Sequence, residues 1–290
     1  MAKLNKRAKY NRFTAFDCAL YLLMILFMAA IIIPFMHVIS VSLSSNAYVV
    51  TGRVSLWPRG FTFETYRHIL KDGAFLNAYK NTLIVTVVGT TLSLTVTAMC
   101  AYALSRRAIV GHKLFSIMIT ITMFFSGGLI PTYLAVTGYG LGNSRWAMIF
   151  PALINTWNMI IMRSFFIAYP SEIVESGQLD GLQEAGVFFR LVLPTSKAAL
   201  ATIALYYAVA YWNSYMSARM YIRDTDLFPV QHFLQKLIER ASNEIDVDDV
   251  HVSASVRYAS IMVVVVPIMC VYPFIQKYFV KGVMVGSIKG

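Results

Sequence analysis

ESGQLDGLQEAGVFFRLVLP, residues 175–194, is a polar, glycine-broken segment in a chain that is otherwise mostly apolar. Three acidic residues, Glu175, Asp180 and Glu184, lie in it, between two long uncharged stretches. The 290 residues are 58% hydrophobic and 13% charged, and a soluble domain carries about twice that charged share. The composition therefore indicates an integral membrane protein, with this segment outside the bilayer.

Intervals without ionisable side chains predict six membrane-spanning helices, because a helix needs about 20 mostly apolar residues to cross a bilayer. The predicted spans are roughly 17–40, 80–105, 114–134, 146–166, 198–221 and 257–277. They predict an all-α polytopic membrane protein with a single transmembrane domain over 1–290. The first span is too long for a typical signal peptide, so we expect it to be retained.

The positions of Lys and Arg predict the orientation of the chain in the membrane. Basic residues gather in the N-terminal segment 1–16, in the short loop at 106–113 and towards the tail 278–290. Six spans place all three on one side, which we take as cytoplasmic, and the segment 168–195 on that side too. Anchoring of this kind accounts for the net charge of +11, and no basic patch interleaved with stacking aromatics indicates nucleic-acid binding.

The predicted spans contain almost no ionisable residues. Proton- or sodium-driven carriers usually keep Asp, Glu, His or Lys near the middle of the membrane, so a proton-coupled mechanism has little support. His37 lies at the end of a span and is interpreted as interfacial. The sequence contains no phosphate-binding loop, metal motif or catalytic grouping. The chain is therefore not expected to be an enzyme, and any ATP would be hydrolysed by another subunit.

Local signals in the segment 168–195 predict two short helices with a sharp bend. Pro170 and Ser171 favour the start of a new helix, and Asp180-Gly181 permits a turn. The apolar residues of the second stretch are Leu182, Val187, Phe188 and Phe189. The segment is either an interfacial connector or a docking surface for a cytoplasmic partner, and its acidic residues favour docking.

The spacing resembles the cytoplasmic loop of bacterial ABC-importer permeases, whose pattern is EAA, three residues, Gly, nine residues, an aliphatic residue, any residue, Leu, Pro. Glu175-Ser176-Gly177, Gly181, Leu191, Leu193 and Pro194 follow this spacing. Ser176 and Gly177 replace the usual Ala-Ala and lower the helix propensity of the first turn.

Four further stretches look like carbohydrate-type permeases of the maltose-permease G-subunit-like group, particularly the subgroup that imports oligosaccharides such as alginate or pectin fragments. They are FFSGGLIPTYL (124–134), INTWNMIIMRSFF (154–166), ALYYAVAYWNSY (204–215) and YFVKGVMVGSIKG (278–290). The resemblance implies a type I ABC-importer permease fold with a cytoplasmic coupling helix, in the bacterial inner membrane, with both termini cytoplasmic.

The resemblance also implies partners. They are a second, homologous permease in a heterodimer, two ATP-binding subunits and an extracytoplasmic solute-binding protein. ATP and Mg²⁺ would be bound by the ATPase subunits, so this chain would hold no cofactor or metal.

The residues that would couple the chain to an ATPase are those of the loop. They are Glu175, Ser176, Gly177, Asp180, Gly181, Leu182, Glu184, Val187, Phe188, Leu193 and Pro194. Among them, Leu182, Val187 and Phe188 are expected to enter a groove of the ATPase. The tail would add contacts through Lys281, Gly282, Lys289 and Gly290.

Aromatic and amide side chains in the fourth and fifth spans are the candidates to line a sugar pathway, because sugars stack on aromatic faces and bond to amides. They are Asn155, Trp157, Asn158, Tyr206, Tyr207, Tyr211, Trp212, Asn213 and Tyr215. Trp212 and Tyr215 are three residues apart and would share a helix face. Aromatic belts and helix packing are the alternative explanation. The alternative function is an ion-coupled secondary sugar carrier or channel that works without ATPase partners. A membrane scaffold or assembly protein is the third possibility.

Overall fold

The computed structural model describes residues 15–106, 109–243, 255–271 and 273, and within them the chain is helical apart from turns and loops. The only β pairing in these ranges is an isolated bridge between Ser44 and Phe61. The chain divides into two compact units. One contains the residues up to Ile69 together with Ala241–Met262, and the other contains Leu70–Arg240 and the residues from Val263 onward.

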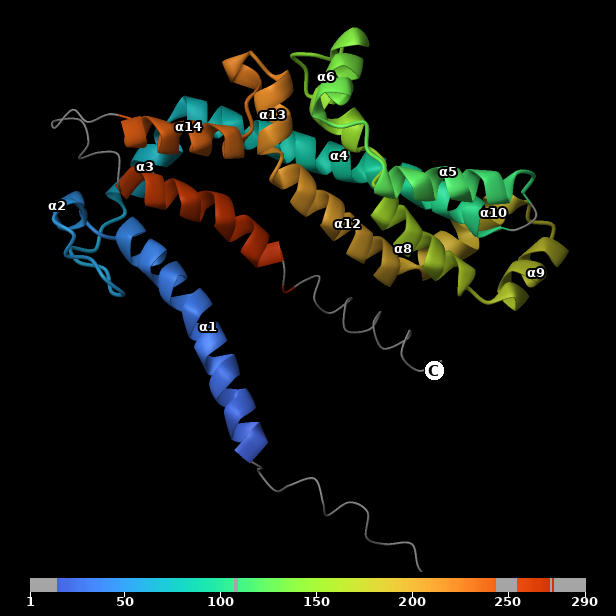
Figure 1. Ribbon diagram of the computed structural model, residues 1–290, viewed down its shortest axis with the longest axis horizontal. Helices are drawn as coiled ribbons and strands as arrows, with labels where there is room; N and C mark the ends of the chain where they lie inside the picture. The colour runs from blue at the N-terminus through green and yellow to red at the C-terminus, as the bar shows by residue number, and fades with distance from the viewer. Residues whose placement is uncertain (1–14, 107–108, 244–254, 272, 274–290) are drawn as a thin grey trace, which may run out of the picture. The chain divides into compact units, whose positions relative to one another are not determined.

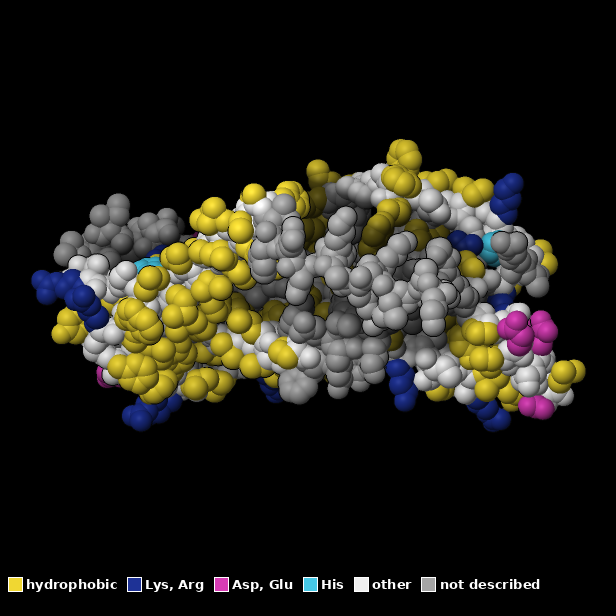
Figure 2. Space-filling model, turned by 90° about the horizontal axis from the view of Figure 1, so that it is seen from below, with side chains coloured by type: hydrophobic (Ala, Val, Ile, Leu, Met, Phe, Trp, Pro, Cys, Tyr) yellow, Lys and Arg dark blue, Asp and Glu magenta, His cyan; other side chains and the backbone are white. Residues whose placement is uncertain are grey.

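The first unit is dominated by a long apolar helix, α1 (Ala15–Ser42), followed by α2 (Asn46–Val50) and the start of α3 (Glu64–Lys71). Large hydrophobic side chains are exposed along α1 from Phe16 to Ile33, and Figure 2 shows a broad hydrophobic surface there. Its apolar part is not covered by the rest of the unit. Such a surface is stable when lipid surrounds it.

Polar contacts fold the segment after α1 back onto the end of that helix. The hydroxyl of Ser40 donates to the Leu56 carbonyl (2.6 Å), and the hydroxyl of Tyr66 donates to Ser42 (2.8 Å). A ring nitrogen of His37 lies 2.9 Å from the Ser55 carbonyl oxygen. His37 thus belongs to a group of polar contacts at the end of α1, and its interpretation as an interfacial residue stays a prediction.

The second unit contains most of the helices (Figure 1). In chain order they are α4 (Gly73–Ser105), α5 (His112–Phe124), α6 (Leu129–Gly138), α7 (Trp146–Ile149), η1 (Phe150–Ala152), α8 (Thr156–Ile167), α9 (Ser171–Leu179), α10 (Glu184–Val187), the π-helix η2 (Phe188–Val192), α11 (Leu193–Thr195), α12 (Lys197–Trp212), α13 (Tyr215–Tyr221), η3 (Thr225–Leu227) and α14 (Val230–Asn243). A further apolar helix, Ser255–Val271, contributes residues to both units, because the division falls between Met262 and Val263.

The core of the second unit forms where α4 packs against α8 and α12. One buried face of α4 repeats every fourth residue, the spacing that keeps side chains on one side of a helix. Its residues are Asn81, Val85, Gly89, Ser93, Thr97 and Ala101. A Cβ atom on Gly89 would lie 2.8 Å from the ring of Tyr211, so glycine allows this ring to lie against the α4 backbone. Small residues that bring helices close together are typical of membrane proteins.

In the described residues, two helices, α1 and α4, are long and apolar enough to cross a membrane, or up to four if each bent pair counts as one span. The count of six therefore stays a prediction. The third predicted span is divided into α5 and α6, and the chain bends by 116° between the two helices. Gly128, with a φ of +82°, lies at that break because glycine adopts this conformation without strain.

Three other predicted boundaries differ from the structure. α4 begins at Gly73 rather than near residue 80, because the Asp72 side chain accepts a hydrogen bond from the Ala74 amide (2.9 Å) and caps the helix. The fourth predicted span is interrupted between η1 and α8, and the fifth between α12 and α13. The last span, predicted as 257–277, reaches beyond the described residues.

Replacing Gly89 with Ala tests the close packing of α4. The added Cβ atom would collide with the Tyr211 ring, and overpacking of this kind costs about 1–3 kcal/mol. We expect a lower thermal unfolding midpoint for the purified membrane complex. Gly73→Ala is the matched control, because a Cβ atom there meets nothing within 4 Å. Equal midpoints for the two variants would contradict the packing described above.

Candidate functional site

The segment 168–195 folds as two helices joined by a tight turn at Gly181. The Gly181 amide donates to the Gln178 carbonyl (3.0 Å), and the Leu182 amide donates to the Gly177 carbonyl (2.9 Å). These two bonds form a Schellman motif, in which glycine takes the left-handed position, and Gly181 has a φ of +85°. The bend predicted at Asp180-Gly181 is therefore present.

One face of this segment is built into the core of the second unit. Val174, Val187, Phe188 and Val192 are buried there. Val187 is fully buried and offers no surface to a partner. Phe188 is 5% exposed, but it lies on the wall of a cavity of about 380 Å³ that Tyr102 and Arg106 also line. The expectation that Val187 enters an ATPase groove is wrong, because this side chain holds the loop to its own chain. For Phe188 the expectation stays a prediction. Leu182 is half-buried and also packs against the core.

The opposite face of the segment is open. Leu179, the last residue of α9, is 89% exposed, and Ile173 and Phe189 are exposed as well. The acidic residues Glu172, Glu175, Asp180 and Glu184 are exposed, and Figure 2 shows acidic side chains gathered at the end of the molecule where α9 lies in Figure 1. The sequence analysis missed Leu179, although its place directly before the Asp-Gly turn was a usable signal.

The remaining predicted loop residues occupy several environments. Ser176 is exposed and Gly177 is buried. A Cβ atom on Gly177 would lie 2.5 Å from Cδ1 of Leu191. Leu193 is half-buried and packs against the core, and Pro194 is exposed. The predicted tail residues Lys281, Gly282, Lys289 and Gly290 lie outside the described residues.

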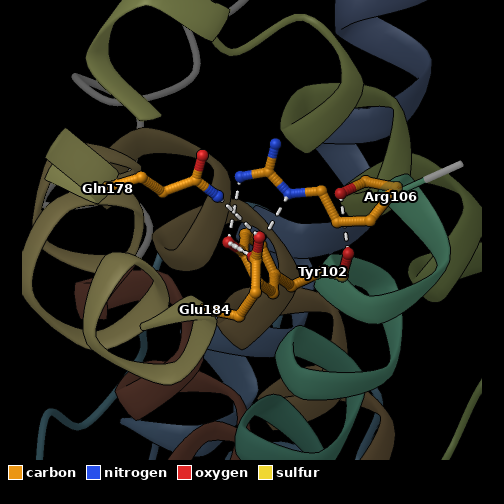
Figure 3. Close-up of polar contacts among 5 residues, drawn as sticks. Tyr102, Arg106, Gln178 and Glu184 are labelled. Carbon is orange, nitrogen blue, oxygen red and sulfur yellow. Dashed lines mark hydrogen bonds and ion pairs between the residues drawn. The ribbon is translucent and has the colours of Figure 1, made fainter. Parts of the chain in front are cut away.

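A polar network joins the loop to the end of α4 (Figure 3). The Tyr102 hydroxyl donates to Oε2 of Glu184 (2.9 Å), and Gln178 donates to Oε1 of the same carboxylate (2.9 Å). Arg106 donates to the Tyr102 oxygen (2.9 Å), and its Nε lies 3.9 Å from Glu184. The ion pair is partly exposed and contributes little alone. The network nevertheless fixes both α9 and α10 to α4.

A second feature of this unit is a cavity of about 740 Å³ between the fourth and fifth predicted spans. Seven of the residues predicted to line a pathway lie on its wall: Asn155, Trp157, Asn158, Tyr206, Tyr207, Tyr211 and Asn213. The sequence analysis did not assign Ser214, Ser217 or the methionines Met148 and Met216, which also line it. Among the described residues on this wall, none carries a charge.

Trp212 and Tyr215 were also predicted for the pathway, but the structure places neither on the cavity wall. Trp212 is buried and donates through Nε1 to the Val264 carbonyl (3.2 Å). Tyr215 stacks on His232. The two do not share a helix face, because α12 ends at Trp212 and α13 begins at Tyr215.

His232 is the titratable group behind Tyr215. Burial lowers the pKa of its imidazole, and the charges of Lys236 and Arg219 lower it further. This ring is therefore neutral at neutral pH. In the described residues, no group of three or more His, Cys, Asp or Glu side chains could hold a metal ion.

Comparison with known proteins gives consistent matches over most of the chain. The family model described as "Binding-protein-dependent transport system inner membrane component" matches residues 93–285. The polygalacturonan/rhamnogalacturonan transport system permease protein YtcP of Bacillus subtilis (strain 168) is 38% identical over 281 residues, which are 95% of this chain and 98% of that protein. Protein LplC of the same organism is 37% identical over 267 residues, 90% of each chain.

A solved structure has the same fold. It is the crystal structure of a bacterial ABC transporter involved in the import of the acidic polysaccharide alginate. The matched chain has a TM-score of 0.86 and 31% sequence identity, and the match covers 92% of this chain and 99% of that one. The helical arrangement described above is therefore that of an ABC-importer permease.

Replacing Tyr102 with Phe tests the network that holds the loop. The change removes the hydroxyl that contacts both Glu184 and Arg106. We expect the backbone amides of residues 171–187 to exchange hydrogen about three- to tenfold faster, the loss of roughly one hydrogen bond. Mass spectrometry of the purified permease complex measures this exchange, with Tyr139→Phe as control because Tyr139 is exposed. Unchanged exchange would mean that the apolar face alone holds the loop.

Proposed function

The chain belongs to the family of binding-protein-dependent transport system inner membrane components, and we propose that it forms part of the translocation pathway of an ATP-driven oligosaccharide importer and is coupled to an ATPase through residues 168–195. It is the non-catalytic permease subunit of an ABC transporter, and ATP hydrolysis belongs to a separate subunit. Acidic oligosaccharides are the proposed substrate class, since named relatives import polygalacturonan, rhamnogalacturonan and alginate.

The observation that supports the coupling role is that the two faces of the loop differ. Its inner face is packed into the core, while Leu179 stands exposed at the bend. A loop that served only as a connector would not need a rigid turn, a polar network to α4 and an exposed leucine. A partner that covers Leu179 would remove its apolar surface from water, which stabilises the complex.

The cavity supports the pathway role. Its wall combines aromatic rings, amides and hydroxyls. Trp157, Tyr206 and Tyr207 lie on the same wall as Asn155 and Asn158. These groups suit the ring faces and hydroxyls of sugars. Since no charged side chain lies on the described wall, the carboxylates of an acidic sugar would be met by amides here, or by charges on the partner permease.

The proposed assembly has the composition typical of this transporter class. The partners are a second, homologous permease, two ATP-binding subunits and an extracytoplasmic solute-binding protein. ATP and Mg²⁺ are held by the ATPase subunits, and the contact of the tail at 278–290 with them remains part of the proposal. Both termini are placed in the cytoplasm, and ATP binding shifts the complex between its two states.

The experiment that tests the proposal measures sugar uptake and ATP hydrolysis by the reconstituted complex with its binding protein. Oligosaccharides of galacturonan, rhamnogalacturonan and alginate are compared with neutral maltodextrins. We expect ATP-dependent uptake, with hydrolysis stimulated by at least one of the acidic sugars. Uptake that persists without ATP and collapses with the proton gradient would instead support an ion-coupled carrier.

Replacing Leu179 with Ser tests the docking surface. Burying a leucine side chain contributes about 1.5–3 kcal/mol, so we expect the affinity of the ATPase for the permease complex to fall about tenfold or more. Uptake should fall with it. Leu179→Met keeps an apolar side chain of similar size and should behave as wild type. Normal affinity and uptake with serine would show that Leu179 lies outside the interface.

Replacing Trp157 with Ala tests the cavity. This side chain is 56% exposed and lies on the wall, where it can stack on a sugar ring. We expect the sugar concentration for half-maximal stimulation of ATP hydrolysis to rise about two- to tenfold, since an aromatic contact contributes about 0.5–1.5 kcal/mol beyond the area that it buries. Trp146→Ala, a partly exposed tryptophan away from the wall, is the control. Equal effects of the two changes would argue against this cavity as the sugar pathway.

A further inference from the structure

Two pairs of hydroxyl groups, both buried, connect α4 to the cavity wall. Oγ1 of Thr97 lies 2.7 Å from the Tyr207 hydroxyl oxygen, and Oγ of Ser93 lies 2.8 Å from that of Tyr211. Ser93 and Thr97 are fully buried and do not line the cavity, whereas both tyrosines do. Each tyrosine therefore lines the cavity and is hydrogen-bonded through its hydroxyl to α4.

The same tyrosines also bond to the interrupted backbone between α7 and α8. The Tyr207 oxygen accepts a hydrogen bond from the Asn155 amide (2.9 Å), and the Tyr211 hydroxyl donates to the Ile149 carbonyl (3.2 Å). A break in a membrane helix leaves such backbone groups without helical partners, and they must be satisfied inside the protein. The segment that these two hydrogen bonds hold is followed by the start of α8, and Asn155, Trp157 and Asn158 there lie on the cavity wall.

About one and a half turns beyond Thr97 on α4, the Tyr102 hydroxyl donates a hydrogen bond to Glu184 of the loop. A single continuous helix is thus joined to the loop at one end and to the cavity wall in its middle. Gly89 belongs to the same face and gives the Tyr211 ring its place against α4.

We propose that Thr97 and Ser93 are positioning residues for transport: their hydrogen bonds fasten the cavity wall to α4, so that a displacement of the loop at 168–195 moves the wall. The inference rests on the proposed coupling role of that loop. The hydroxyls do not touch the sugar. Their hydrogen bonds determine whether a displacement of the loop is transmitted to the side chains of the cavity wall, which contact the sugar.

The test replaces Thr97 with Val in the complete reconstituted importer. We expect basal ATP hydrolysis to remain normal, while the ratio of sugar-stimulated to basal hydrolysis and the sugar transported per ATP both fall about three- to tenfold, the equivalent of about one hydrogen bond. Thr97→Ser retains the hydroxyl and should restore both values. Thr95→Val is the matched control, because the Thr95 hydroxyl bonds only to the Thr91 carbonyl of its own helix.

A second variant identifies the partner of Thr97. If both residues act through the same bond, Thr97→Val combined with Tyr207→Phe should lower the coupling ratio no further than the more severe single change. Additive losses would overturn the proposal, as would a normal ratio in Thr97→Val. So would a lower yield and thermal midpoint with an unchanged ratio, since that result indicates a purely structural role.

The wild-type complex separates this inference from the proposed function. If it shows no sugar-stimulated hydrolysis with any tested sugar, the proposed function fails and the inference fails with it. If wild type is stimulated and Thr97→Val is stimulated equally, only the inference is overturned.

Discussion

Every backbone amide or carbonyl group freed inside a membrane must find its partner within the protein, because lipid offers none. The interruption before α8 lies in a predicted span, and side chains provide the partners for its freed backbone groups. The Asn155 side chain accepts from the Asn158 amide, while Tyr207 and Tyr211 bond to the Asn155 amide and the Ile149 carbonyl. The break is thereby made stable, and it opens the cavity wall that a continuous helix would not provide.

Two glycines in the loop have different physical roles. Gly181 provides a left-handed backbone conformation, with open space where a side chain would be. Gly177 instead provides room, because Leu191 packs against it. Glycine costs about 1 kcal/mol of helix propensity relative to alanine, and the closer approach of Leu191 offsets part of that loss. This accounts for Gly177 where the family pattern has alanine, while Ser176 is exposed, and a side chain there does not affect the core.

The parts of the fold that could be predicted from sequence depend on short-range signals. Pro170, Ser171 and Gly181 act within a few residues, so the two helices of the loop and their bend were predictable. The start of α4 was missed because the prediction began the apolar span at Lys80. That side chain is exposed and α4 continues past it, while Asn77 and Asn81 bond to the Asp226 carbonyl on a segment distant in sequence.

The direction in which a side chain points could not be predicted in the same way. An apolar face can turn towards a partner or towards its own chain, and the sequence pattern is the same in both cases. Val187 and Phe188 turn inward, where the π-helix η2 changes the residue period that an α-helical pattern assumes. Trp212 and Tyr215 are separated by a helix break. The sequence between them contains no proline or glycine from which the break could be predicted. The cavity residues were largely found because amides in an apolar span need a polar environment, and that requirement is independent of helix phase.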